Sequence, residues 1–85
     1  MKQSVYIAID KTDGEPIMAS FKEEDIIQRL HEWNDLDTAS KIIKDEKVDI
    51  PGDTSGSLER IIVYESELLG ELCQTTYQIW CLEVL

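Results

Sequence analysis

The segment 77–85 constrains how the whole chain can pack. Its sequence, Tyr-Gln-Ile-Trp-Cys-Leu-Glu-Val-Leu, is rich in β-branched and aromatic residues and predicts a strand. Alternate side chains of a strand point to opposite faces, with Ile79 and Cys81 on one face and Trp80, Leu82 and Val84 on the other. Both faces are largely apolar, so the strand needs cover on both sides. Cover for the second face can come from a loop, a partner or a second copy of the chain.

The first twenty residues predict a β-hairpin. Residues 4–10 alternate between Val5, Ile7 and Ile9 on one face and more polar positions on the other. Asp13-Gly14 is a typical hairpin turn because glycine accepts a positive φ. Residues 17–21 are expected to return as the second strand, after a proline that suits a strand end or a sheet edge.

A helix is predicted from about Glu23 to Trp33, where the apolar residues recur at helical spacing. The apolar stripe, expected to be buried, consists of Ile26, Ile27, Leu30 and Trp33. The polar residues expected to point away from it are Glu24, Asp25, Gln28, His31 and Glu32.

The middle of the chain is less clearly patterned. A second, weaker helix is predicted over 34–44, and the turn-forming residues 49–57 predict an exposed loop. The segment 58–72 fits either one helix or a strand near 60–65 followed by a helical turn near 67–73. The run Ile61-Ile62-Val63-Tyr64 favours the strand.

These segments together predict a small α+β protein with a single domain over residues 1–85. It would have about four mostly antiparallel strands, including the N-terminal hairpin and the C-terminal strand. Two or three short helices would pack on one face of this sheet. Helices on one face cannot cover the other, so part of the second face is expected to be free for a partner.

The charge balance narrows the classes of partner. The chain has 18 acidic and 8 basic residues, a formal net charge of −10 in 85 residues. Such a surface repels nucleic-acid phosphates and anionic lipids and attracts basic proteins. Neither a nucleic acid nor a membrane is therefore expected as a direct partner.

The sequence contains no set of residues that predicts catalysis, a metal or a cofactor. The only histidine is His31, and Cys73 and Cys81 do not form a C-x-x-C pair. Gly52-Asp53-Thr54-Ser55-Gly56 suits a turn better than a protease loop, which needs a histidine base on a larger scaffold. We therefore expect no enzyme, with both cysteines as reduced core thiols. The absence of a signal-peptide pattern or a long apolar run predicts a cytoplasmic protein.

Two hypotheses for function follow. The first is a non-enzymatic module that binds a basic protein surface. In size and charge the chain is similar to short acidic domains of phages and mobile elements that inhibit nucleic-acid-binding host proteins. The second is a structural or regulatory module that dimerises or docks through the apolar sheet face, with its charge serving only solubility. The residues predicted to meet a partner are Glu24, Asp25, Glu32, Asp35, Asp37 and Trp80.

Overall fold

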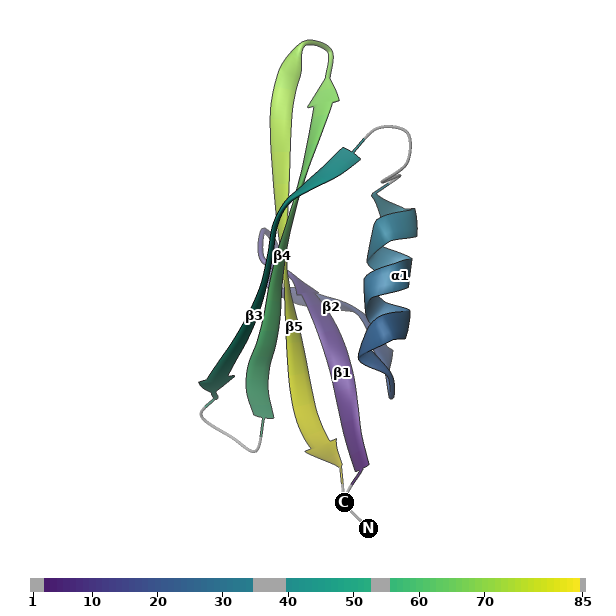
Figure 1. Cartoon of the computed structure of the whole chain (residues 1–85), viewed down its shortest axis with the longest axis vertical. Helices are drawn as coiled ribbons and strands as arrows, with labels where there is room; N and C mark the ends of the chain where they lie inside the picture. The colour runs from purple at the N-terminus through teal and green to yellow at the C-terminus, as the bar shows by residue number, and fades with distance from the viewer. Residues whose placement is uncertain (1–2, 35–39, 53–55, 85) are drawn as a thin grey trace.

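A computed structural model describes residues 3–34, 40–52 and 56–84, in which five antiparallel strands form one sheet (Figure 1). The elements in chain order are β1 (Gln3–Asp10), β2 (Glu15–Ser20), α1 (Glu23–Trp33), β3 (Ser40–Pro51), β4 (Gly56–Leu68) and β5 (Glu71–Val84). The strand order across the sheet is β2-β1-β5-β4-β3, so β2 and β3 are the two edges. The chain passes from one edge to the other by way of α1, which lies on one face of the sheet (Figure 1).

The predicted α+β class is wrong. The described residues form five strands and a single helix, which makes the fold mostly β. The predicted second helix over 34–44 overlaps β3, whose residues pair with β4 from Ser40↔Ser66 to Pro51↔Ser57. Ile42 and Ile43 fit helical spacing, but β-branched side chains also favour a strand, and the pairing with β4 gives that strand its hydrogen bonds. The predicted loop over 49–57 likewise overlaps the end of β3 and the start of β4.

The N-terminal hairpin is confirmed. Gly14 has a φ of +70° and donates its backbone N–H to the carbonyl of Asp10 at 2.8 Å. The carboxylate of Asp10 also accepts a hydrogen bond from the backbone N–H of Thr12 at 2.9 Å. These contacts close the turn between β1 and β2, where Asp-Gly was expected.

The long β4–β5 hairpin extends beyond the other strands (Figure 1). A strand over 60–65 was expected and is present as part of β4, but the helical turn predicted over 67–73 is wrong. The chain reverses instead at Leu69 and Gly70, whose φ values are +53° and +80°. Two successive residues with positive φ suit a two-residue hairpin turn, although leucine is an unusual choice for the first of them.

The core lies between α1 and the face of the sheet that it covers. Tyr6↔Cys81, Ala8↔Ile79 and Ile62↔Tyr77 are paired positions, and side chains at paired positions share a face. Ala8, Ile79 and Ile62 are fully buried beneath the helix, as are Ile26 and Leu30 of α1 itself. The complete core cluster is Ala8, Ile26, Leu30, Ile62, Tyr64, Tyr77 and Ile79.

Candidate functional site

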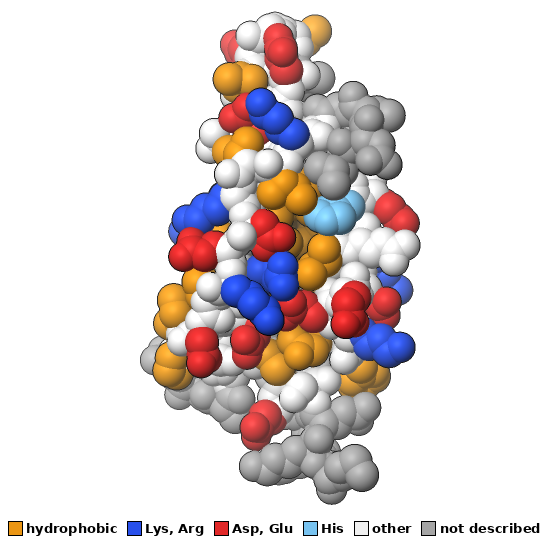
Figure 2. All heavy atoms as spheres, viewed as in Figure 1, with side chains coloured by type: hydrophobic (Ala, Val, Ile, Leu, Met, Phe, Trp, Pro, Cys, Tyr) orange, Lys and Arg blue, Asp and Glu red, His pale blue; other side chains and the backbone are white. Residues whose placement is uncertain are grey.

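The outer face of α1 carries exposed carboxylates. Glu24, Asp25 and Glu32 are all exposed, as predicted, while Ile26 and Leu30 on the inner side are buried. We call these three residues the acidic helix face. Asp25 accepts a hydrogen bond from the Ser20 hydroxyl at 3.2 Å, and Glu32 accepts one from the Gln28 amide at 3.5 Å. Figure 2 shows acidic side chains at the outer edge of the molecule over α1, with basic side chains among them.

These carboxylates have little positive charge to neutralise them. Arg29 is the one Lys or Arg residue in the sequence of α1, beside four acidic residues. Two lysines of β3 form ion pairs with carboxylates outside α1. Lys41 lies 3.6 Å from Glu65, and Lys44 lies 3.2 Å from Glu46. Arg29 lies beside Asp25 and Glu32, so the three carboxylates and this one guanidinium group leave a net charge of −2 that can attract a basic surface from outside the molecule.

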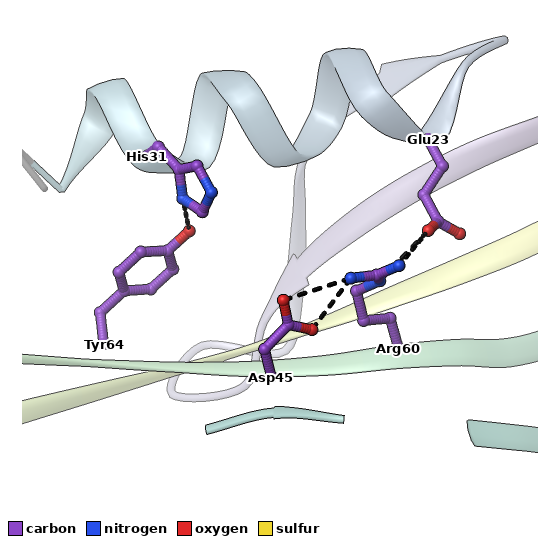
Figure 3. Close-up of polar contacts among 5 residues, drawn as sticks. All are labelled: Glu23, His31, Asp45, Arg60 and Tyr64. Carbon is purple, nitrogen blue, oxygen red and sulfur yellow. Dashed lines mark hydrogen bonds and ion pairs between the residues drawn. The ribbon is translucent and has the colours of Figure 1, made fainter. Parts of the chain in front are cut away.

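Arg60 lies between the helix and the sheet (Figure 3). Its guanidinium group is 2.9 Å from the carboxylate of Glu23 on α1 and 3.0 Å from that of Asp45 on β3. Its side chain is only 18% exposed. Arg60 thus joins α1 to the edge strand β3 and reduces the repulsion between two carboxylates, although the three groups together still carry one negative charge. This arrangement is structural and leaves Arg60 no free charge for a ligand.

Replacement of Arg60 by methionine should lower the free energy of unfolding by about 1–3 kcal/mol, because two partly buried carboxylates lose a charged hydrogen-bond donor. Urea denaturation would measure the change. Lys44→Met is the matched control, because it breaks an ion pair whose side chains are both about half exposed. The control should lose less than about 1 kcal/mol. Equal losses in the two variants would show that Arg60 does not join the helix to the sheet.

The C-terminal end of α1 differs from its prediction. Trp33 was expected to be buried but is 68% exposed. His31, expected to point outward, is half-buried, and its Nδ1 lies 2.7 Å from the hydroxyl of Tyr64 (Figure 3). The amide of Asn34 donates to the hydroxyl of Tyr77 at 3.3 Å. Buried tyrosine hydroxyls need hydrogen-bond partners, so polar side chains face the sheet here and Trp33 faces outward.

Trp80, the predicted aromatic anchor, lies on the other face of the sheet. It is paired with Ile7 on β1 and Leu58 on β4, whereas α1 covers the face that carries Ile79. A Cβ atom at Gly52 would stand only 3.1 Å from the Trp80 ring, so the backbone directly after β3 packs closely against this ring. Trp80 therefore cannot belong to the same binding surface as the acidic helix face. Two further predicted residues, Asp35 and Asp37, lie outside the described residues.

The face of the sheet opposite α1 is apolar. Strand pairing places apolar side chains on it, and we call eight of them, from β1, β4 and β5, the apolar sheet face: Val5, Ile7, Ile9, Leu58, Ile61, Val63, Trp80 and Leu82. Leu58 and Val63 are buried by their neighbours, and the other six are each half-buried. Within the described residues, no helix covers this face. As expected, both faces of β5 carry apolar side chains, and a helix covers only one of the two faces.

The described residues contain no group of three or more His, Cys, Asp or Glu side chains that could hold a metal ion. Cys73 is exposed, contrary to its prediction as a core thiol, and Cys81 is half-buried; both are free thiols. Over the same part of the chain, no helix is long and apolar enough to cross a membrane.

No protein-family model, curated protein or solved structure matches this chain. Its function must therefore be argued from its own surfaces.

Proposed function

We propose that this chain is a non-enzymatic binding module whose acidic helix face docks on a basic surface of another protein. The observation that carries the proposal is the outer face of α1, which exposes Glu24, Asp25 and Glu32 beside the exposed Trp33. About seven residues of helix separate Asp25 from Glu32, so their carboxylates are spread over roughly 10 Å along the axis. Such a row can engage several Arg or Lys side chains at once.

Trp33 replaces Trp80 as the proposed aromatic anchor. An indole beside carboxylates can stack on an arginine of the partner while the carboxylates bind neighbouring cations.

The position of Glu32 in the helix also supports a binding role for the acidic helix face. Acidic residues in the first turn of a helix stabilise its N-terminus, which gives Glu24 and Asp25 a structural role as well. Glu32 lies near the C-terminus of α1, where the helix dipole disfavours a negative charge, so stability alone does not explain it.

The partner surface that fits best is one that binds nucleic-acid phosphates, because the same Arg and Lys side chains would bind these carboxylates. The most specific form of the proposal is an inhibitor, of the kind that phages and mobile elements use, that occupies the nucleic-acid site of a host protein. We place this activity in the cytoplasm. The free, exposed thiol of Cys73 supports a reducing compartment.

Charge reversal tests the proposal. The partner would first be recovered by pull-down and mass spectrometry, and the kinetics of its binding to the purified chain would then be measured. Replacing Asp25 and Glu32 together with lysine should slow association by roughly tenfold or more, because charge steers the encounter. The reversal should affect dissociation less. Nucleic acid should compete with the chain for the partner.

The matched control reverses Asp13 and Glu15, two exposed residues at the turn between β1 and β2. It changes the net charge by the same amount but leaves α1 unaltered. Circular dichroism of both variants would verify that they are folded. Association of the wild-type chain should also slow as salt rises from about 0.1 M to 1 M and the Debye length falls from about 10 Å to 3 Å. The acidic helix face is not the binding surface if the association rate does not change with salt and both double reversals have the same effect on it.

A further inference from the structure

The charges that flank the apolar sheet face along the paired length of β3 and β4 are balanced, although the chain as a whole carries −10. Strand pairing places Lys41, Lys44, Glu46 and Glu65 on this side of the two strands. Lys41 pairs with Glu65 at 3.6 Å, and Lys44 pairs with Glu46 at 3.2 Å. Glu59 lies at the irregularity between Leu58 and Arg60, where its carboxylate accepts a hydrogen bond from Ser57. The excess negative charge therefore lies mainly on other parts of the surface.

From this distribution we infer that the apolar sheet face is the contact surface between two copies of the chain. A sheet with an apolar face normally buries it against a second layer, and α1 supplies a layer for the other face alone. A basic partner would find no net charge here to attract it. A second copy presents an identical neutral, apolar face, which matches it in both polarity and charge. A twofold axis would place the two sheets face to face, as in a β-sandwich.

The charge of the chain does not oppose this arrangement. Stacked sheets lie about 10 Å apart, and each α1 lies on the far side of its own sheet, so the two acidic helix faces would be separated by roughly 30 Å. That distance is about three Debye lengths at 0.1 M salt, so repulsion between them is largely screened. The dimer would display one acidic helix face on each side and could bind two basic surfaces at once.

Trp80 lies within this interface, where aromatic residues commonly contribute most to binding. It is half-buried, with the backbone of Gly52 close to one part of its ring. Ile7 and Ile61 on the flanking strands are half-buried as well, so a second copy could cover all three side chains. This inference does not depend on the proposed function, because no residue of the acidic helix face takes part.

Sedimentation equilibrium over micromolar to millimolar protein tests the inference. The wild-type chain should form a dimer whose affinity is unchanged or slightly higher as salt rises from about 0.1 M to 1 M, because the contact is apolar and uncharged and little repulsion between the copies is left to screen. Binding to a basic partner should weaken over the same range of salt, so the two proposals can fail separately. Ile61→Lys should raise the dimer dissociation constant about tenfold or more, because it buries a charge in the contact. It should do so even though it reduces the net negative charge.

Phe21→Lys is the matched control, because Phe21 is 62% exposed beside the start of α1 and lies outside the apolar sheet face. It makes the same change of charge and should leave the dimer unchanged or slightly tighter. If Ile61→Lys does not fold, the salt dependence of the wild-type dimer still decides the question. A chain that is monomeric throughout this range of concentration would overturn the inference. A monomer whose apolar sheet face binds an apolar segment of another protein would overturn it as well. The inference would also be overturned by a dimer whose dissociation constant rises with salt or is unchanged by Ile61→Lys.

Discussion

Leu30→Ala should lower the free energy of unfolding by about 2–5 kcal/mol, the usual cost of truncating a buried leucine. Leu30 is fully buried in the cluster that joins α1 to the sheet, where Ala8, Ile62 and Tyr64 are also buried. Removing its side chain leaves a cavity between α1 and the sheet, where Leu30 and Ile26 are the two fully buried side chains of the helix. Urea denaturation followed by circular dichroism would measure the loss.

Trp33→Ala is the informative control, because Trp33 belongs to the same apolar stripe by spacing but is 68% exposed. It should change the free energy of unfolding by less than about 0.5 kcal/mol, as is usual at exposed positions. A large loss at Trp33 together with a small one at Leu30 would mean that α1 packs through a different side. The pair of variants therefore tests the orientation of the helix and the exposure of the proposed anchor.

The parts of the fold that sequence predicted are those determined by local contacts. Asp13-Gly14 closes a hairpin through its own backbone geometry, and the spacing of Ile26 and Leu30 defines the buried side of α1 without reference to the sheet. The bounds of α1 agree with the prediction for the same reason.

The parts that sequence missed depend on distant partners. Ser40–Pro51 has apolar spacing that suits either a helix or a strand, and its pairing with β4 decides the outcome. The turn at Leu69 and Gly70 was missed because leucine at a positive φ is rare, whereas Asn-Gly there would have predicted it. The length of the β4–β5 pairing holds this turn in place.

The candidate site was only partly predictable. The exposure of Glu24, Asp25 and Glu32 followed from the helical pattern. The separation of Trp80 from them did not, because it depends on which face of the sheet α1 covers. The exposure of Trp33 depends on Tyr64 and Tyr77, whose hydroxyls lie against His31 and Asn34. A buried tyrosine that faces the end of a helix indicates that a polar side chain of that helix end contacts its hydroxyl. The sequence alone does not show which tyrosine faces which helix end.

The buried tyrosines should also make the stability of the folded protein depend strongly on pH in alkaline solution. Burial raises the pKa of Tyr64 above its ordinary value of 10.0, and the negative charges that Tyr77 and Asp45 can carry raise it further. Burial also raises the pKa of Tyr77, against a smaller lowering by its hydrogen bond with Asn34. Tyr6 has a raised pKa as well, again mainly through burial. These are all three tyrosines of the chain.

The folded protein should therefore lose stability as the pH rises above about 10. In that range the unfolded chain releases its tyrosine protons while the folded chain keeps them, so each added pH unit favours unfolding by up to about 1.4 kcal/mol per tyrosine. The contribution is fully present below pH 10 and is lost as the pH rises through the folded pKa values. We expect tyrosinate absorbance and loss of circular dichroism to appear together in one cooperative transition.

Tyr64→Phe provides the control for this prediction. It keeps the ring against Tyr77, which it meets edge to face at 5.6 Å between centroids, but it removes the hydroxyl that contacts His31. The variant should be less stable at neutral pH, because His31 loses a partly buried hydrogen bond. Its stability should also fall less steeply above pH 10, because one fewer proton is released on unfolding. Tyrosines that ionise near pH 10 while the circular dichroism is unchanged would contradict the burial of Tyr64 and Tyr77 beneath α1.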